Sequence, residues 1–313
     1  MITLYDTSIA SKNVGDFIIM DAVKRHLYPL ISDQIATLPT HDSIGRSGLS
    51  ILKNSKYSVV GGSNLLSSHI LNYNQWKFSF VDLLFLKNSV LMGVGWWQYQ
   101  DKPDKYTEKV LKRILSDNYI HSVRDNHTLE QLKSIGFDNV LNTSCPTMWD
   151  LTKAHCGAIK STKSDSVVFT LTDYNKDIER DGNLLKVLNK NYKEIYYWPQ
   201  GYGDLSYLQE LSSNKDYKFV ILNPHLISLN AALEGEVDYI GTRLHAGIRA
   251  LQLSCRTIII GIDNRAEEKA KDFKLSVLPR NKILELETLI NSDLPCEVII
   301  PEENIEKWKS QFN

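Results

Sequence analysis

The sequence lacks any apolar run long enough to cross a membrane. Its two most apolar stretches are residues 89–97 and 257–262, whereas a transmembrane helix needs about 20 apolar residues. The first ten residues, MITLYDTSIA, also lack the basic start and the apolar centre of a secretory signal peptide. These absences predict a soluble, cytoplasmic protein.

Cysteine is scarce, and neither sign of charge is in excess. The four cysteines show no C-x-x-C spacing, and His, Cys and Asp form no clustered set, so the sequence predicts no disulfide framework and no metal site. The 36 basic and 37 acidic side chains give a formal net charge of −1. This balance excludes a general attraction to nucleic acid, so any anion must be bound by a local site.

What the sequence does contain is a regular alternation of strand-like and helix-like segments. Its 313 residues exceed what one hydrophobic core usually supports, so two domains are expected. Apolar residues at helical spacing separate the strand-like runs, which predicts parallel βαβ units with right-handed crossovers. The predicted strands are residues 2–5, 34–38, 57–60, 89–92, 119–123, 139–141, 167–171, 194–198, 218–222, 237–240, 257–262 and 276–278.

A polar stretch, residues 158–165, interrupts this alternation and is the predicted linker. We therefore predict an α/β protein with an N-terminal Rossmann-like domain (1–157) and a C-terminal one (166–300). A terminal helix (301–313) begins with proline and two glutamates. Two doubly wound domains joined in this way are expected to face a cleft. Because ligands bind outside the carboxyl ends of such strands, the strand-to-helix turns are the places to look for chemistry.

The strongest chemical signal is the turn that leads from predicted strand 237–240 into a helix starting at Arg243-Leu244-His245. Arg243 and His245 stand in the first helical turn, where the helix dipole disfavours cations. Cations placed against that preference indicate a bound phosphate or carboxylate, which the free N–H groups would also hold. The alternative is a surface salt bridge for the arginine and a polar contact for the histidine.

Three other turns carry polar residues or glycines. The N-V-G-D turn at 13–16 contains Asp16, which either caps a helix or presents a carboxylate to a sugar hydroxyl. The G-G-S-N loop at 61–64 suits an anion or a sugar hydroxyl, although any tight turn uses such glycines. Arg124 ends the fifth predicted strand, where it either faces the cleft or pairs with Asp125.

The order of these segments resembles that of the polysaccharide pyruvyltransferase family. Members show N-x-G-D near the amino terminus, then G-G-[GS] after a strand, G-x-G, V-R-D-x-x-[ST], a proline turn near mid-chain, and R-L-H-A. In this chain the corresponding segments are residues 13–16, 61–63, 93–95, 123–125 with Thr128, 145–146 and 243–246. The resemblance spans about residues 10 to 275, and R-L-H-A is its most specific part.

Two positions depart from the family pattern. An aspartate usually precedes the mid-chain proline, and this chain has Cys145 there. A lysine is common after the last strand of the pattern, and this chain offers Arg265. Arginine keeps the positive charge but not the geometry, because guanidinium is a planar fork and ammonium a point charge. Both departures bear on the chemistry more than on the fold.

The resemblance implies a GT-B-like pair of domains, with the acceptor on the N-terminal side and the donor on the C-terminal side. It implies transfer of pyruvate from phosphoenolpyruvate to a sugar, with a ketal formed, phosphate released and no cofactor required. Such chemistry needs cations around the donor and a proton donor to its methylene carbon. The expected donor-binding residues are Arg124, Arg243, Leu244, His245 and Arg265. The expected catalytic residues are His245 as acid, Arg243, and Asp16 as the group that orients or deprotonates the acceptor. The expected acceptor-binding residues are Asn13, Gly15, Asp16, Gly61, Gly62, Ser63 and Asn64.

Two other functions stay open at this point. One is a nucleotide-sugar glycosyltransferase with its arginines on a diphosphate, and the other is a non-catalytic relative that binds a glycan or phosphate. The sugar acceptor is either a lipid-linked oligosaccharide or a soluble sugar nucleotide. A lipid-linked acceptor would bring the protein to the inner face of the cytoplasmic membrane, as a peripheral protein. The oligomeric state is open.

Overall fold

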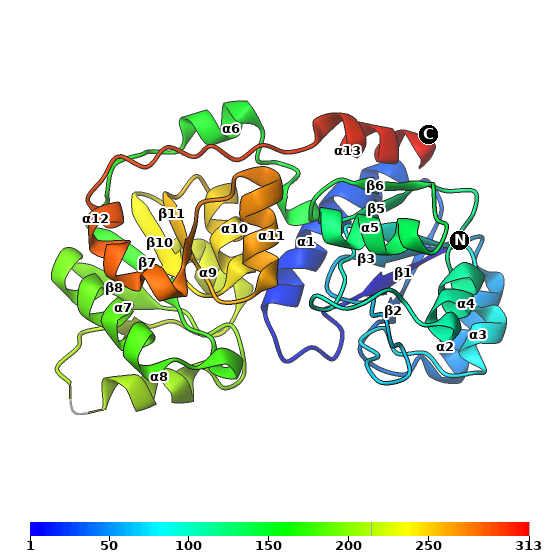
Figure 1. Cartoon of the computed structure of the whole chain (residues 1–313), viewed down its shortest axis with the longest axis horizontal. Helices are drawn as coiled ribbons and strands as arrows, with labels where there is room; N and C mark the ends of the chain where they lie inside the picture. The colour runs from blue at the N-terminus through cyan, green and yellow to red at the C-terminus, as the bar shows by residue number, and fades with distance from the viewer. Residues whose placement is uncertain (214, 313) are drawn as a thin grey trace. The chain divides into compact units, whose positions relative to one another are not determined.

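The structure, a computed structural model, describes residues 1–213 and 215–312. These residues fall into two compact units (Figure 1). Unit 1 contains Met1–Ser11, Ile19–Trp149 and Ile300–Asn313, and unit 2 contains Lys12–Ile18 and Asp150–Ile299. Each helix within the described ranges is too short or too polar to span a bilayer.

Unit 1 is built on parallel strands. Its four-stranded sheet has the order β2-β1-β3-β4, and β5 pairs with β6. A parallel bridge between Val94 and Val123 connects the residues after β4 to β5. The strands are β1 (Ile2–Asp6), β2 (Ile35–Pro39), β3 (Ser58–Gly61), β4 (Ser89–Met92), β5 (His121–Val123) and β6 (Val140–Asn142). The helices of this part of the chain are α1 (Gly15–Leu27, which begins in unit 2), η1 (Tyr28–Leu30), α2 (Gly45–Asn54), α3 (Asp82–Phe85), α4 (Lys105–Ile114), α5 (Asn126–Ser134), η2 (Pro146–Met148), α13 (Glu302–Lys309) and η5 (Ser310–Phe312).

Unit 2 has a six-stranded parallel sheet with the order β12-β11-β10-β7-β8-β9. Its strands are β7 (Ser166–Thr170), β8 (Glu194–Tyr197), β9 (Val220–Ile221), β10 (Val237–Gly241), β11 (Thr257–Gly261) and β12 (Val277–Pro279). Its helices are α6 (Lys153–Ala158), η3 (Asp173–Asn175), α7 (Ile178–Asn191), α8 (Asp204–Ser212), α9 (Leu226–Ala232), α10 (Leu244–Gln252), α11 (Asn264–Phe273), η4 (Arg280–Glu285) and α12 (Leu286–Ile290).

Helices cover both faces of the unit 2 sheet, as alternating side chains require. Val167 and Phe169 of β7 belong to the apolar cluster that includes α7, α8 and α12. On the other face α10 packs closely on the sheet, because a Cβ at Gly247 would come within 2.5 Å of Ile259 and 3.0 Å of Tyr239. Figure 1 shows α7, α8 and α12 on one side of this sheet and α10 and α11 on the other. The predicted α/β class with doubly wound, parallel sheets is confirmed.

The predicted strands all appear, and their ends shift by at most two residues. The division of the chain differs from the expected ranges. Residues 12–18 and 150–157, expected in the N-terminal domain, belong to unit 2. The terminal helix, expected as a segment separate from both domains, belongs to unit 1. The expected linker 158–165 packs within unit 2, because the carbonyl oxygen of Ser161 accepts hydrogen bonds from Arg256 Nε (2.7 Å) and the N–H of Leu294 (3.0 Å). The terminal helix α13 is held in unit 1 by Trp308, which is fully buried and donates to the carbonyl of Leu91 (3.1 Å).

Gly62, in the loop after β3, is fixed by the backbone and by its neighbour. Its φ is +62°, and a Cβ would lie 2.2 Å from Cγ2 of Ile19, a stiff β-branched side chain on α1. We expect Gly62→Ala to lower the free energy of unfolding by about 3 kcal/mol, through strain and overpacking together. Gly45 is the matched control, since its φ is +60° but a Cβ there meets no atom within 4 Å. Gly45→Ala should cost about 1 kcal/mol in the same urea unfolding experiment, and equal losses for the two variants would contradict the packing argument.

Candidate functional site

Several strands of unit 2 deliver polar side chains to one edge of the sheet. Asp173 follows β7, Gln200 follows β8, Arg243 follows β10 and Asp263 follows β11. The carboxyl ends of parallel strands share an edge, which is where ligands bind in folds of this type. This edge is therefore the candidate site that unit 2 contains.

The turn from β10 into α10 is held by hydroxyl groups. The Tyr239 hydroxyl donates to the carbonyl of Arg243 (2.8 Å), and the N–H of Arg243 donates to Oγ1 of Thr170 (3.2 Å). Burial raises the pKa of Tyr239, so this hydroxyl stays protonated and remains a donor. The Thr172 and Thr242 hydroxyls bond each other at 2.8 Å. The N-cap residue of α10, Arg243, makes no side-chain cap hydrogen bond, so the positive end of the helix dipole lies at a turn that these hydroxyls fix.

Arg243 lies in a buried ion pair rather than on the surface. Only 4% of the residue is exposed, and its Nε lies 3.0 Å from Oδ2 of Asp204 and 3.1 Å from the carbonyl oxygen of Leu171. Its Nη2 pairs with Oδ1 of Asp204 and lies 2.9 Å from Oδ1 of Asp173. Two carboxylates thus match its charge, and the guanidinium ties the ends of β7 and β10 to α8. The surface salt bridge considered for Arg243 is wrong.

Asp204, the first residue of α8, accepts hydrogen bonds from several donors. It is fully buried and accepts the N–H groups of Gly201 (2.7 Å), Gln200 (3.1 Å) and Asp173 (3.1 Å), besides the Arg243 guanidinium. Burial raises the pKa of this carboxyl, while Arg243 and the backbone donors oppose the shift and favour the carboxylate. Sequence reasoning missed Asp204, although its place just after a strand end was a usable signal.

The N-x-G-D segment joins the same edge of the unit 2 sheet. Oδ1 of Asn13 accepts hydrogen bonds from Nε2 of Gln200 (2.9 Å) and from the N–H of Gly15 (3.1 Å). The N–H of Val14 donates to the carbonyl of Gln200 (3.0 Å), and Asn13 forms a bridge with Gly201. This segment was expected in the N-terminal domain, and the structure places it in unit 2 together with Arg243. Asp16, in the first turn of α1, is 7% exposed.

Gln200 is a second residue that sequence reasoning missed. It is 4% exposed, and its amide nitrogen is used by Asn13. Its buried Oε1 has no hydrogen-bond partner among the described residues. A buried acceptor without a partner costs free energy, so its presence is easiest to explain if a ligand donates to it.

Tyr174 brings Arg243 and Arg265 together. The guanidinium carbons lie 5.1 Å and 6.0 Å from the centre of its ring, within the range of cation–π attraction. Arg265 also pairs with Asp263 and bonds the Tyr174 hydroxyl. Tyr174 is 58% exposed, so the two predicted arginines flank an aromatic residue that is open to a ligand.

Leu244 and His245 open α10 in unit 2, whereas the predicted residues Arg124 and Gly61-Gly62-Ser63-Asn64 lie in unit 1. Arg124 is 3% exposed, and its Nε lies 3.1 Å from Oδ2 of Asp125, the ion pair that was the alternative interpretation. A Cβ at Gly95 would come 2.0 Å from that Nε, so the second glycine of G-x-G makes room for Arg124. The glycines of the G-G-S-N loop pack on α1, and Oδ1 of Asn64 is buried without a partner among the described residues. Arg124 and this loop share a unit that does not contain Arg243.

Cys145, the departure before the mid-chain proline, is 1% exposed and precedes η2. The proline beside it explains the first glycine of G-x-G. Gly93 has a φ of +65°, and a Cβ there would lie 2.1 Å from Cδ of Pro146. The mid-chain turn thus packs directly on the end of β4, which fits a structural role for this segment.

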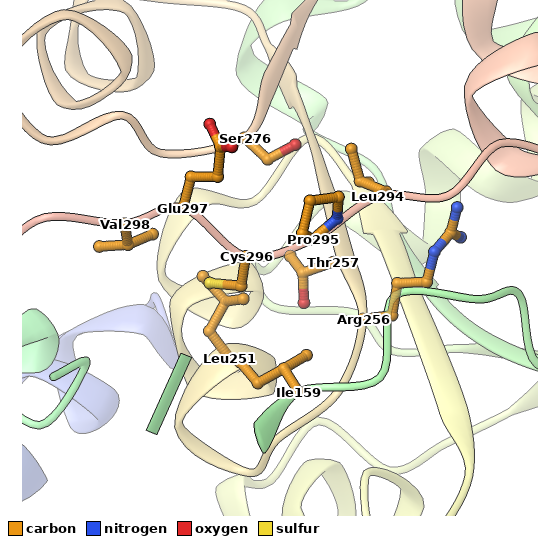
Figure 2. A pocket seen from close by; sticks show the side chains of 10 residues that line it. All are labelled: Ile159, Leu251, Arg256, Thr257, Ser276, Leu294, Pro295, Cys296, Glu297 and Val298. Atoms are coloured by element: carbon orange, nitrogen blue, oxygen red, sulfur yellow. The ribbon is translucent and has the colours of Figure 1, made fainter. Parts of the chain in front are cut away.

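A small pocket of unit 2 lies away from the candidate site (Figure 2). Arg256 and Thr257 stand at the amino-terminal end of β11, so the pocket is at the opposite edge of the sheet. The Arg256 guanidinium is occupied by Asp238 and by backbone carbonyl oxygens, which makes this a structural pocket. Within the described ranges, no group of three or more His, Cys, Asp or Glu side chains is placed to hold a metal ion.

The chain matches one family model and several solved structures. The family model for polysaccharide pyruvyl transferase matches residues 13–264. No curated protein sequence matches the chain.

Several solved structures are similar to this chain. One is UDP-GlcNAc 2-epimerase from Methanocaldococcus jannaschii in complex with UDP-GlcNAc and UDP, with a TM-score of 0.56 and 11% identity. The match covers 99% of this chain and 98% of that one. The UDP-GlcNAc 2-epimerase from Neisseria meningitidis has a TM-score of 0.51 and 11% identity, covering 99% and 98%. S. aureus MnaA, in a structure with UDP, has a TM-score of 0.51 and 10% identity, covering 98% and 94%. At such identities the likeness establishes the GT-B-like fold alone.

Proposed function

Because the chain belongs to the polysaccharide pyruvyl transferase family, we propose that it transfers pyruvate from phosphoenolpyruvate to a sugar of a bacterial polysaccharide or its precursor. The observation that carries this proposal is the family match over residues 13–264, which includes the turn at Arg243 and the N-x-G-D segment. The reaction would take place in the cytoplasm.

The proposed reaction sets what the site must do. One sugar hydroxyl adds to C2 of the enol phosphate while the methylene carbon takes a proton and becomes a methyl group. A second hydroxyl then displaces phosphate from C2. Of the two protons that the hydroxyls lose, one balances the proton taken up by the methylene carbon and the other leaves on the phosphate. The products are a cyclic pyruvate ketal and inorganic phosphate. No electrons are gained or lost overall, so no redox cofactor is required.

The donor phosphate would bind at the start of α10. The N–H group of Leu244 opens the helix there, where the N-cap residue Arg243 makes no side-chain cap hydrogen bond, and the helix dipole favours an anion. Arg243 would act mainly by fixing this turn through Asp204, and Arg265 would meet the donor beside Tyr174. His245, the second residue of α10, would protonate the methylene carbon.

The acceptor would bind beside the N-x-G-D segment. Gln200 offers its buried Oε1 to a sugar hydroxyl, next to Asn13 and Gly15. Asp16 would take a hydroxyl proton. Roles for Arg124 on the donor, and for the loop Gly61-Gly62-Ser63-Asn64 on the acceptor, stay predictions.

A backbone substitution tests the donor site. Leu244 is the first helical residue of α10, and Arg243 before it has φ −91° and ψ 103°, which a following proline accepts. Leu244→Pro therefore removes one N–H group while the helix can still start. Its matched control, Leu244→Ala, loses the same buried side chain and keeps the N–H. In calorimetric titration with phosphoenolpyruvate, Leu244→Pro should bind about tenfold more weakly than Leu244→Ala, the value of one charge-assisted hydrogen bond.

The wild-type protein is then assayed for phosphate release with phosphoenolpyruvate and a panel of sugar nucleotides and lipid-linked sugars. Phosphate release together with a new ketal on one acceptor supports the proposal. If the wild type does not bind phosphoenolpyruvate, or if it transfers the sugar of a nucleotide sugar to another molecule, pyruvyl transfer is wrong and a glycosyltransferase takes its place.

A further inference from the structure

A segment of unit 1 presents apolar side chains to solvent. It comprises residues 77–87, contains α3 and is called the α3 segment below. Its helical hydrogen bonds begin at Ser79, and Phe80, Val81 and Leu84 are 76%, 51% and 65% exposed. Residues four apart on a helix share a face, so Phe80 and Leu84 lie together, with Val81 beside them.

Positive charge borders these apolar side chains. Lys77 and Lys87, near the two ends of the segment, are both exposed. The one acidic residue of the segment, Asp82, is buried. Arg113 of α4 is exposed and donates from Nε to the carbonyl of Leu83 (2.8 Å), which keeps a third cation against the segment. Figure 1 shows α3 beside α2 and α4.

The α3 segment differs from the exposed apolar residues of unit 2, because its apolar side chains lie together and cations border them. Ile227 and Leu284 are 81% and 82% exposed, but isolated exposed residues are normal on soluble proteins. A second copy of the chain suits the α3 segment poorly. Lysine is depleted in protein interfaces, and a two-fold axis through the segment would bring like charges together. An anionic bilayer complements both the apolar centre and the cationic border.

We propose that the α3 segment docks the protein on an anionic phospholipid membrane. Phe80 and Leu84 enter the boundary between headgroups and acyl chains, and Lys77, Lys87 and Arg113 contact the phosphates. This peripheral contact does not depend on which reaction the protein catalyses, and its test requires no activity assay.

The test is cosedimentation of the full chain with vesicles of phosphatidylglycerol and phosphatidylethanolamine, and with vesicles of phosphatidylcholine alone. We expect binding to the anionic vesicles, weakened by salt. The double variant Phe80→Ser, Leu84→Ser should lower the partition coefficient about tenfold or more. Lys77→Gln and Lys87→Gln should each lower it about fivefold.

The matched control is the double variant Ile227→Ser, Leu284→Ser, which removes apolar side chains that are more exposed than Phe80 and Leu84 and should bind like the wild type. All four residues are exposed, so the variants should fold, which circular dichroism checks. The proposal is overturned if the wild type binds neither vesicle, or if the Phe80 and Leu84 variant binds as well as the control. It is also overturned if sedimentation velocity shows a dimer that these two substitutions dissociate, because the segment would then join two copies.

Discussion

His245→Gln is expected to slow phosphate release from phosphoenolpyruvate about 100-fold or more, the contribution typical of a general acid. The assay uses the acceptor found in the panel described above. His245 is the second residue of α10 and is 6% exposed, and glutamine has a similar size. It can hydrogen-bond, but it cannot deliver a proton near neutral pH. Donor binding, measured by calorimetry, should therefore change little while the rate falls.

A half-buried histidine of unit 2 provides the control. His155 in α6 bonds the carbonyl of Leu251 through Nε2 (2.7 Å) and lies outside the candidate site. His155→Gln should release phosphate at close to the wild-type rate. If His245→Gln does the same, His245 is not the acid, and the proton must come from another group.

Asp204→Ala is expected to be the most destabilising of the substitutions considered, with a loss of about 3–5 kcal/mol in the free energy of unfolding. The change leaves the Arg243 guanidinium buried without its main counter-charge. It also removes the acceptor of three backbone N–H groups, those of Asp173, Gln200 and Gly201. Urea unfolding followed by circular dichroism measures the loss.

Asp173→Ala is the matched control, because Asp173 touches the same guanidinium from the surface. Its side chain is 31% exposed, and it meets Nη2 of Arg243 at 2.9 Å. An ion pair that is partly open to water contributes little, so we expect a loss of about 1 kcal/mol or less. Equal losses for the two aspartates would show that Asp204 is not the residue that holds Arg243 in place.

The alternation of strands and helices was predictable because each element depends on a short-range pattern of apolar and polar residues. Short β-rich runs such as 237–240 and 257–262 needed no information from the rest of the chain, and the structure has β10 and β11 there. Sequence analysis did not find α11, because Asn264–Phe273 is mostly polar and its apolar residues at helical spacing are only Ala266, Ala270 and Phe273. A helix of this kind gains its stability from packing on the neighbouring elements.

The candidate site was predictable only in part. The R-L-H-A turn was found because its residues are adjacent and stand at the start of a helix. Its partners were not, because Asp204 lies 39 residues before Arg243 and Asp173 lies 70 before it. The glycines also show what the sequence could not predict. Gly62 was interpreted as part of a loop that suits an anion or a sugar hydroxyl, and only the structure shows that Ile19 comes too close for any side chain at this position.

The sequence by itself determined the α/β class, the parallel direction of the short strands and the family to which the chain belongs. Each of these depends on local periodicity or on motifs of adjacent residues. Only the tertiary structure decided that Asn13 and Gln200, 187 residues apart, bond each other beside Arg243. It also decided that the Arg243 charge is matched by the buried carboxylate of Asp204 and the partly exposed one of Asp173. The physical reason is that burial and ion pairing depend on which distant segments the fold brings within a few ångströms, and no local pattern records that distance.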